Sequence, residues 1–237
     1  MPHRSISVIL PVYNEEDNIE FVVNSVTGYL SEIIDNFEII LVNDGSVDKT
    51  SGIIESLSKS NPHIKSIRHS KNLGYGVTLH SGFKIAQYSL VFFMDSDRQF
   101  EISDISKLLA HIDQYDIVIG TRATRQDPLY RILIAKLFNY ITCVLFGIKI
   151  KDMTCGFKLI KKSVLDSISI KSKGGFINAE ILIKAKRKIC LIKEVNIRHF
   201  PRIRGKQKGA AFKVTLRKIY ELLNLLYWDR FLRRKNE

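Results

Sequence analysis

Short apolar segments alternate with longer amphipathic ones through the first half of the chain. The apolar runs of strand type occupy residues 6–10, 37–42, 64–69, 90–94 and 116–119. Between them, apolar residues recur at the spacing of one helix face, as at Ile19, Val22, Val23, Val26 and Leu30. This alternation predicts an α/β fold: a Rossmann-like, mostly parallel sheet flanked by helices on both faces.

Polar clusters follow the predicted strands at the positions where each strand ends. They are Asn14-Glu15, Asp44-Gly45-Ser46, residues 72–76 and Asp95-Ser96-Asp97. In a parallel sheet, the carboxyl ends of the strands form the edge at which ligands bind. Each cluster alone fits a solvated turn between a strand and a helix. Four such clusters at one edge of one sheet predict a binding site.

Asp95 and Asp97 are the candidate metal ligands. Side chains two positions apart on an extended chain point to the same side, so these two carboxylates can converge on one cation. Hard oxygen ligands suit Mg²⁺ or Mn²⁺ that carries a substrate diphosphate. By itself the motif is more typical of an acidic turn. Gly74 and Gly76 at a helix start can bring backbone N–H groups to an anion, or can simply provide a helix entry with positive φ.

The second half of the chain contains two further amphipathic segments. Residues 129–150 are strongly apolar but include Arg131, Lys136 and Asn139, which suits a helix in a membrane interface or one that is buried or dimer-forming. Residues 189–197 resemble one more strand. A last helix, residues 211–233, interleaves aromatic and aliphatic residues with Lys and Arg. We assign residues 1–205 to one α/β domain and residues 206–237 to a basic, amphipathic C-terminal helix.

The charge balance predicts an anionic partner. The chain has 37 Lys and Arg against 24 Asp and Glu, a formal net charge of +13, which fits nucleic acid, a membrane surface or phosphorylated substrates.

The three cysteines of the chain have no close pairing, which argues against a disulfide framework or a zinc site and for a reducing compartment. The N-terminus shows no signal peptide, and no run of about 18 apolar residues is present. We therefore expect a cytoplasmic location.

Taken together and in this order, the motifs resemble glycosyltransferase family 2, and most of all its polyprenyl-phosphate branch, which includes dolichyl-phosphate mannosyltransferases. The matching pieces lie at residues 11–16, 42–50, 72–76, 95–99, 120–122, 152–158 and 199–202. The resemblance implies a GT-A fold, a UDP- or GDP-linked sugar donor and a divalent cation, Mg²⁺ or Mn²⁺. Many relatives continue into transmembrane helices, whereas this sequence stops after one amphipathic helix, so we expect any membrane attachment to be peripheral or through a partner.

The resemblance also implies roles for individual residues. On the donor side these are Pro11, Tyr13, Asn14, Glu15, Asp44, Gly74, Ser96 and Asp97. The metal is assigned to Asp95, Asp97 and Gln99. The donor or acceptor phosphates are assigned to Arg122, Arg131 and Arg202. The catalytic set is Asp95, Asp97, Arg122, Arg202 and Glu180, although Glu180 lies near a helix N-terminus, where the helix dipole also favours a capping carboxylate.

The predicted reaction is the transfer of a hexose to a polyprenyl phosphate, with inversion, at the cytoplasmic face of the membrane. Negative charge develops on the leaving diphosphate, where a metal and an arginine can stabilise it. A lipid phosphate is already an anion and needs no general base. One alternative is a saccharide or polymer hydroxyl acceptor, which would need Glu180 or Asp152 as the base. A basic, non-catalytic nucleic-acid binder would leave the acidic motifs unexplained, so we expect no nucleic-acid partner.

Overall fold

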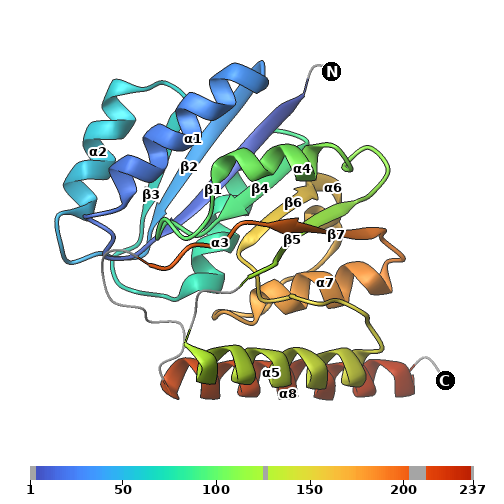
Figure 1. The fold of residues 1–237 in the computed structure, drawn as a ribbon. Helices are drawn as coiled ribbons and strands as arrows, with labels where there is room; N and C mark the ends of the chain where they lie inside the picture. The colour runs from blue at the N-terminus through green and yellow to red at the C-terminus, as the bar shows by residue number, and fades with distance from the viewer. Residues whose placement is uncertain (1–3, 125–127, 203–211, 236–237) are drawn as a thin grey trace.

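The computed structural model describes residues 4–124, 128–202 and 212–235 (Figure 1). Its strands are β1 (Ser5–Val12), β2 (Asn36–Asn43), β3 (Ile64–Arg68), β4 (Leu90–Met94), β5 (Ile117–Arg122), β6 (Phe157–Lys161) and β7 (Ile192–Ile197). Its α-helices are α1 (Ile19–Ile33), α2 (Thr50–Ser60), α3 (Tyr75–Ile85), α4 (Ile105–Leu109), α5 (Leu129–Phe146), α6 (Lys162–Ser167), α7 (Ile177–Arg187) and α8 (Phe212–Lys235).

The strands form one seven-stranded sheet in the order β3-β2-β1-β4-β6-β5-β7. All neighbouring pairs are parallel except those of β6, which runs antiparallel to both β4 and β5. The predicted α/β fold with a mostly parallel sheet is therefore confirmed. Because β6 runs the opposite way, it begins at the edge where β4 and β5 end, with Phe157 beside Met94. The loop before β6 thus reaches the predicted ligand-binding edge.

Helices cover both faces of the sheet (Figure 1). One apolar core joins the sheet to α1, α2 and α4, and a second joins it to α3, α6 and α7. β4 contributes to both, since Phe92 lies in the first core and Phe93 in the second. This burial on both faces explains why the central strands are continuous apolar runs in the sequence instead of alternating apolar and polar residues.

Helices α5 and α8 lie beyond α7, on the outer side of the second core (Figure 1). α8 docks through Leu222, which is buried, and Leu225 and Leu226, which are partly buried. The predicted C-terminal helix is present, and the proposed boundary at 205/206 lies outside the described residues. Within the part of the chain that the structure describes, no helix is long and apolar enough to cross a membrane.

Candidate active site

Asp95 follows β4 directly and is held in place by two neighbours. The Tyr75 hydroxyl, from the start of α3, donates a hydrogen bond of 2.8 Å to Asp95 Oδ1. Gly156, in the loop before β6, lies so close that a Cβ there would stand 2.5 Å from Asp95 Oδ2 and 2.6 Å from Oδ1. No side chain larger than glycine fits against this carboxylate without a shift, so the backbone of the loop forms one wall of the site.

Asp97 lies beside Asp95, and the two carboxylates disturb each other. Asp97 keeps 16% of its side-chain surface exposed, so a small cation can reach it. Burial and the nearby Asp95 charge raise the pKa of Asp97 to about 7, against the opposing effect of Arg202. Burial also raises the pKa of Asp95, although the Tyr75 hydrogen bond and the charges of Arg122 and Lys158 act the other way. Two crowded carboxylates of this kind favour a bound cation.

The carboxylate oxygens of Asp95 and Asp97 fit a divalent cation that a bound substrate also helps to hold. Among the described residues, no group of three or more His, Cys, Asp or Glu side chains could hold a metal ion alone. Asp95 and Asp97 would supply two hard oxygen ligands and would leave the remaining positions to water or a substrate. Mg²⁺ and its close relatives are commonly bound in this way, through one or two carboxylates together with substrate phosphates.

Arg202 joins Asp97 to the opposite wall of the site. Its Nη2 contacts both carboxylate oxygens of Glu15, at 2.6 and 2.7 Å, and its Nη1 lies 3.3 Å from Asp97 Oδ2. Gln99 holds the segment that carries Arg202: its side-chain Nε2 donates to the Phe200 carbonyl at 3.0 Å, and its backbone carbonyl accepts the Phe200 N–H at 2.9 Å. The resemblance assigns Gln99 to the metal, but in the structure its side-chain amide nitrogen hydrogen-bonds the backbone of the 199–202 segment.

Arg122 stands at the end of β5 and is oriented by Asp152. Its Nε and Nη2 each donate to one carboxylate oxygen of Asp152 at 2.7 Å, and Nη2 also reaches Thr154 Oγ1 at 3.1 Å. Planar, bidentate pairs of this kind hold a guanidinium in one orientation. Asp152, considered above as a base, here fixes Arg122, whose charge acts on Asp95.

The residues predicted to bind the nucleotide-sugar donor lie together at the sheet edge. Several of their side chains form hydrogen bonds with the backbone of neighbouring segments at this edge. Asn14 accepts the Val47 N–H at 2.9 Å through its side chain. Asp44 accepts the N–H groups of Leu73 and Gly74, both at 2.9 Å. The Ser96 hydroxyl donates to the Pro11 carbonyl at 3.0 Å. Pro11 and Tyr13 stand at the end of β1, so this edge is assembled as expected, with a framework of hydrogen bonds beneath it.

Glu180, named above as a possible base, is buried on α7 and supports a neighbouring loop. Its two oxygens accept the N–H groups of Lys171 at 2.9 Å and Ser172 at 2.7 Å, and Lys184 forms an ion pair with it. Burial pushes the pKa of Glu180 up, but these bonds outweigh it and leave the pKa below its usual value. The side chain of Arg131, the remaining candidate, lies outside the described part of the structure.

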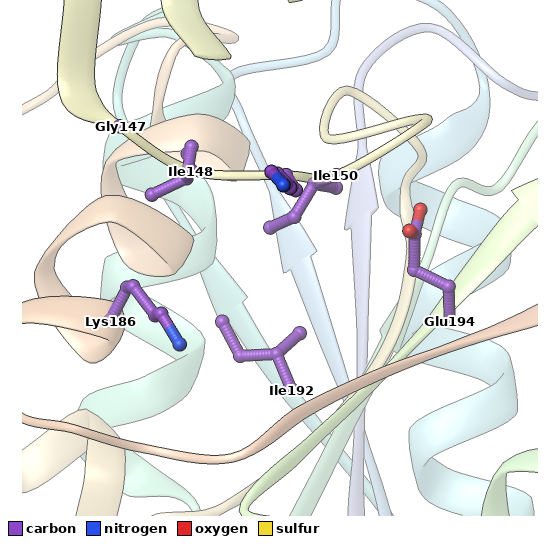
Figure 2. A pocket seen from close by; sticks show the side chains of 7 residues that line it. Gly147, Ile148, Ile150, Lys186, Ile192 and Glu194 are labelled. Atoms are coloured by element: carbon purple, nitrogen blue, oxygen red, sulfur yellow. The ribbon is translucent and has the colours of Figure 1, made fainter. Parts of the chain in front are cut away.

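A separate cleft of about 310 Å³ lies between the α5–β6 loop, the end of α7 and β7 (Figure 2). Its walls are Gly147, Ile148, Lys149, Ile150, Lys186, Ile192 and Glu194, none of which belongs to the carboxylate site. Glu194 accepts the Lys151 N–H at 2.8 Å and the Thr121 hydroxyl at 3.1 Å. The cleft therefore borders the loop that carries Asp152, and Glu194 helps to hold that loop.

Comparisons with known proteins agree with this arrangement. The model of the family described as Glycosyl transferase family 2 matches residues 7–169. Glucosyl-3-phosphoglycerate synthase from Mycobacterium tuberculosis, solved with phosphoglyceric acid, superposes with a TM-score of 0.75 at 20% identity, over 93% of this chain and 79% of that one.

Two further structures of the same enzyme hold a metal. The complex with Mn²⁺, UDP and glucosyl-3-phosphoglycerate gives a TM-score of 0.75 at 20% identity, over 93% of this chain and 79% of that one. The complex with Mg²⁺ and UDP gives 0.72 at 18% identity, over the same 93% and 79%. This likeness supports the GT-A fold. Because the family model spans well over half of the sequence, the chain belongs to glycosyl transferase family 2.

Proposed function

We propose that this protein transfers a hexose from a nucleotide-diphosphate sugar to a polyprenyl phosphate, with inversion, while attached peripherally to the cytoplasmic face of a membrane. The observation that carries the proposal is the Asp95–Asp97 pair, placed with Arg122 and Arg202 at the carboxyl edge of the sheet. The metal-bound UDP complexes of the M. tuberculosis synthase, which shares the fold, support a nucleotide-sugar donor and Mn²⁺ or Mg²⁺.

The donor's departing diphosphate is the first chemical demand on the site. A divalent cation bound by Asp95 and Asp97 would neutralise the charge that develops on the leaving oxygen. Arg122 is held ready by Asp152, and Arg202 by Glu15, so both guanidinium groups are oriented before substrate arrives. Oriented charges need little reorganisation in the transition state, which is why such groups accelerate transfer.

The acceptor is the second demand, and the two candidate acceptors differ in what they require. A phosphate is ionised at neutral pH and attacks without a general base, provided that cations hold it beside the anionic donor. A hydroxyl needs a base within hydrogen-bond reach. The two carboxylates considered for that task are already occupied, Asp152 by Arg122 and Glu180 by backbone N–H groups. This occupancy favours the phosphate.

The membrane part of the proposal is supported by the outward faces of α5 and α8. Both helices expose large apolar side chains: Leu133, Leu137, Tyr140, Val144, Leu216, Tyr220, Leu223 and Tyr227. Exposed apolar area on this scale marks an interaction surface. The start of α8 lies near the site, since Arg217 is beside Gly74, whose neighbour Tyr75 donates a hydrogen bond to Asp95. Lipid bound there would reach the site from the bilayer.

The experiment that tests the proposal offers labelled UDP- and GDP-hexoses to the purified protein with Mn²⁺ or Mg²⁺ and polyprenyl phosphate in vesicles. A labelled glycolipid is expected, and it should disappear when EDTA removes the metal. Parallel reactions contain phosphoglyceric acid, the ligand of the M. tuberculosis synthase, or a free saccharide instead of lipid. Transfer only in those reactions would overturn the lipid acceptor and favour a hydroxyl acceptor.

A further inference from the structure

A buried lysine lies behind Asp95 and takes no part in the reaction described above. Lys158, on β6, has none of its surface exposed. Its ammonium donates to the Met153 carbonyl at 3.2 Å, to the Cys155 carbonyl, and to Asn178 Oδ1 at 2.9 Å. Burying a charge is costly unless its hydrogen bonds are satisfied, and here three donors meet three acceptors. Because burying the Lys158 charge costs free energy, we infer that these three contacts have a role beyond packing.

The partners of Lys158 lead to Asp95 from two sides. On one side, the Asn178 side chain lies near Tyr75, where it opposes the rise that burial causes in the pKa of the phenol. The Tyr75 hydroxyl in turn donates to Asp95. On the other side, Cys155 precedes Gly156, whose backbone lies against the Asp95 carboxylate. The Lys158 ammonium therefore contacts both structures that support Asp95: the Asn178 side chain beside Tyr75, and the 153–155 loop that precedes Gly156.

The same loop also governs Arg122. Residues 153–155, which Lys158 binds, directly follow Asp152, the residue that orients the Arg122 guanidinium. Arg122 and Lys158 also place two positive charges near the Asp95 carboxylate. Through the 153–155 loop, Lys158 is thus connected both to Asp95 and to Arg122, the arginine next to the proposed cation site.

We propose that Lys158 is a positioning residue for sugar transfer, which locks the 153–155 loop and Asn178 so that Asp95 meets the donor's cation in one fixed orientation. The inference rests on the proposed function, because it concerns the same cation site. Groups that orient metal ligands from outside typically contribute 10–100-fold to metal affinity, roughly the effect expected here.

The test measures Mn²⁺ binding by titration calorimetry in the presence of UDP, with GDP in a second series and with no acceptor. Lys158→Met removes the charge and all three hydrogen bonds at similar side-chain volume, so Mn²⁺ binding should weaken roughly 10–100-fold. Lys158→Arg keeps a buried cation and should recover part of the affinity. Lys161→Met is the matched control, since Lys161 lies on the same strand but pairs with Asp116 at 3.2 Å, away from the site.

A purely structural lysine would lower the unfolding temperature of Lys158→Met and leave the Mn²⁺ affinity of the folded protein unchanged, which would overturn the inference. If Lys158→Met does not fold, Asn178→Leu decides, because it removes the Oδ1 acceptor that α7 offers to Lys158: weakened Mn²⁺ binding supports the inference, and unchanged binding overturns it. A wild-type protein that binds Mn²⁺ with neither nucleotide would instead overturn the proposed function, so the two failures are distinguishable.

Discussion

At the scale of single residues, the contact between Gly156 and Asp95 sets the position of the first carboxylate. Gly156→Ala would place a methyl group 2.5 Å from Asp95 Oδ2, well inside van der Waals contact, so the carboxylate or the loop must move. We expect this variant to lose at least about tenfold in Mn²⁺ affinity, as for other changes that displace metal ligands. Titration of Mn²⁺ in the presence of UDP measures the loss.

Gly28→Ala provides the matched control. Gly28 lies on α1, and a Cβ there meets nothing within 4 Å. Alanine in an exposed helix should add roughly 0.5–1 kcal/mol to the free energy of unfolding and leave Mn²⁺ affinity unchanged. Equal Mn²⁺ affinity in the two alanine variants would contradict the close packing of Gly156 on Asp95.

The raised pKa of Asp97 predicts how substitution there depends on pH. A carboxyl whose pKa is about 7 in the folded chain and near 3.8 unfolded binds more protons when folded. Its contribution to stability is therefore full below about pH 4 and is lost as the pH rises to about 7. Metal-free Asp97→Asn should unfold at a higher temperature than wild type at pH 8, with the advantage shrinking toward pH 5.

Turnover by Asp97→Asn should be abolished, since the amide cannot replace a charged metal ligand. Asp113→Asn serves as the control: Asp113 is exposed and pairs with Arg4 at 2.6 Å, remote from the site. Thermal unfolding in EDTA at both pH values and glycolipid formation at pH 7 give the two readouts. An active Asp97→Asn enzyme would remove Asp97 from the metal site.

The sequence reveals Asp95 and Asp97 but not the residues that hold them. Two carboxylates two positions apart after an apolar run are visible in the pattern itself. Lys158 and Asn178 are not, because their contacts join β6 to α7, and no local spacing reports which buried polar groups meet across a sheet and a helix. A local signal exists only for Lys158, which stands between Phe157 and Leu159-Ile160 in a short apolar run, where a lysine marks a paired charge.

At the scale of whole elements, most strands and helices could be predicted and one strand direction could not. Apolar periodicity indicated the runs at 6–10, 37–42 and 90–94, which lie within β1, β2 and β4. The antiparallel direction of β6 depends on the path of the 147–156 segment, which returns to the carboxyl edge before the strand starts. Neighbours along the sheet are tertiary contacts, and residue spacing carries no information about them.

Helix α7 offers a test of whether Glu180 is a base or a structural anchor. Glu180→Gln removes a charge that two backbone N–H groups and Lys184 stabilise, so we expect a loss of roughly 1–3 kcal/mol in the free energy of unfolding at pH 7. The pKa of Glu180 is lower in the folded chain than in the unfolded chain. The charge therefore stabilises the fold at pH values above the unfolded-state pKa, and this stability is lost as the pH falls through the folded-state pKa. The difference should shrink in acid.

Chemical denaturation at pH 7 and in acid measures this difference, and exposed Glu55→Gln on α2 should show neither effect. The turnover of folded Glu180→Gln separates the two roles. An anchor predicts turnover close to wild type for the folded fraction. A thousandfold drop in kcat with unchanged stability would establish Glu180 as a general base and would reopen the hydroxyl acceptor.

At the scale of the whole molecule, the proposed membrane attachment combines basic charge with the apolar faces of α5 and α8. A net charge of +13 would draw the protein to anionic lipid, and this attraction would weaken with salt. Burial of apolar side chains is insensitive to screening and would retain the protein once it is bound. Binding to vesicles should therefore fall with ionic strength to a plateau above zero.

Replacing Leu137 and Leu223 by Glu should remove that plateau. Leu137 of α5 and Leu223 of α8 are 60% and 57% exposed, so neither is needed in the core. Each leucine that enters the bilayer interface contributes about 1.5–3 kcal/mol, and its loss together with added negative charge should weaken vesicle binding by roughly a hundredfold or more. Co-sedimentation with anionic vesicles measures it, together with glycolipid formation from vesicle-borne acceptor.

The control for this pair is Leu191→Glu. Leu191 is 55% exposed in the loop before β7, at the opposite edge of the sheet from Asp95, and its replacement should leave vesicle binding unchanged. Mn²⁺ affinity in the presence of UDP should be equal in the wild type and in both variants, because none of these side chains approaches Asp95. Glycolipid formation that survives the loss of vesicle binding would show that the acceptor reaches the site without these helices. Joint loss of both would tie the apolar face to acceptor delivery.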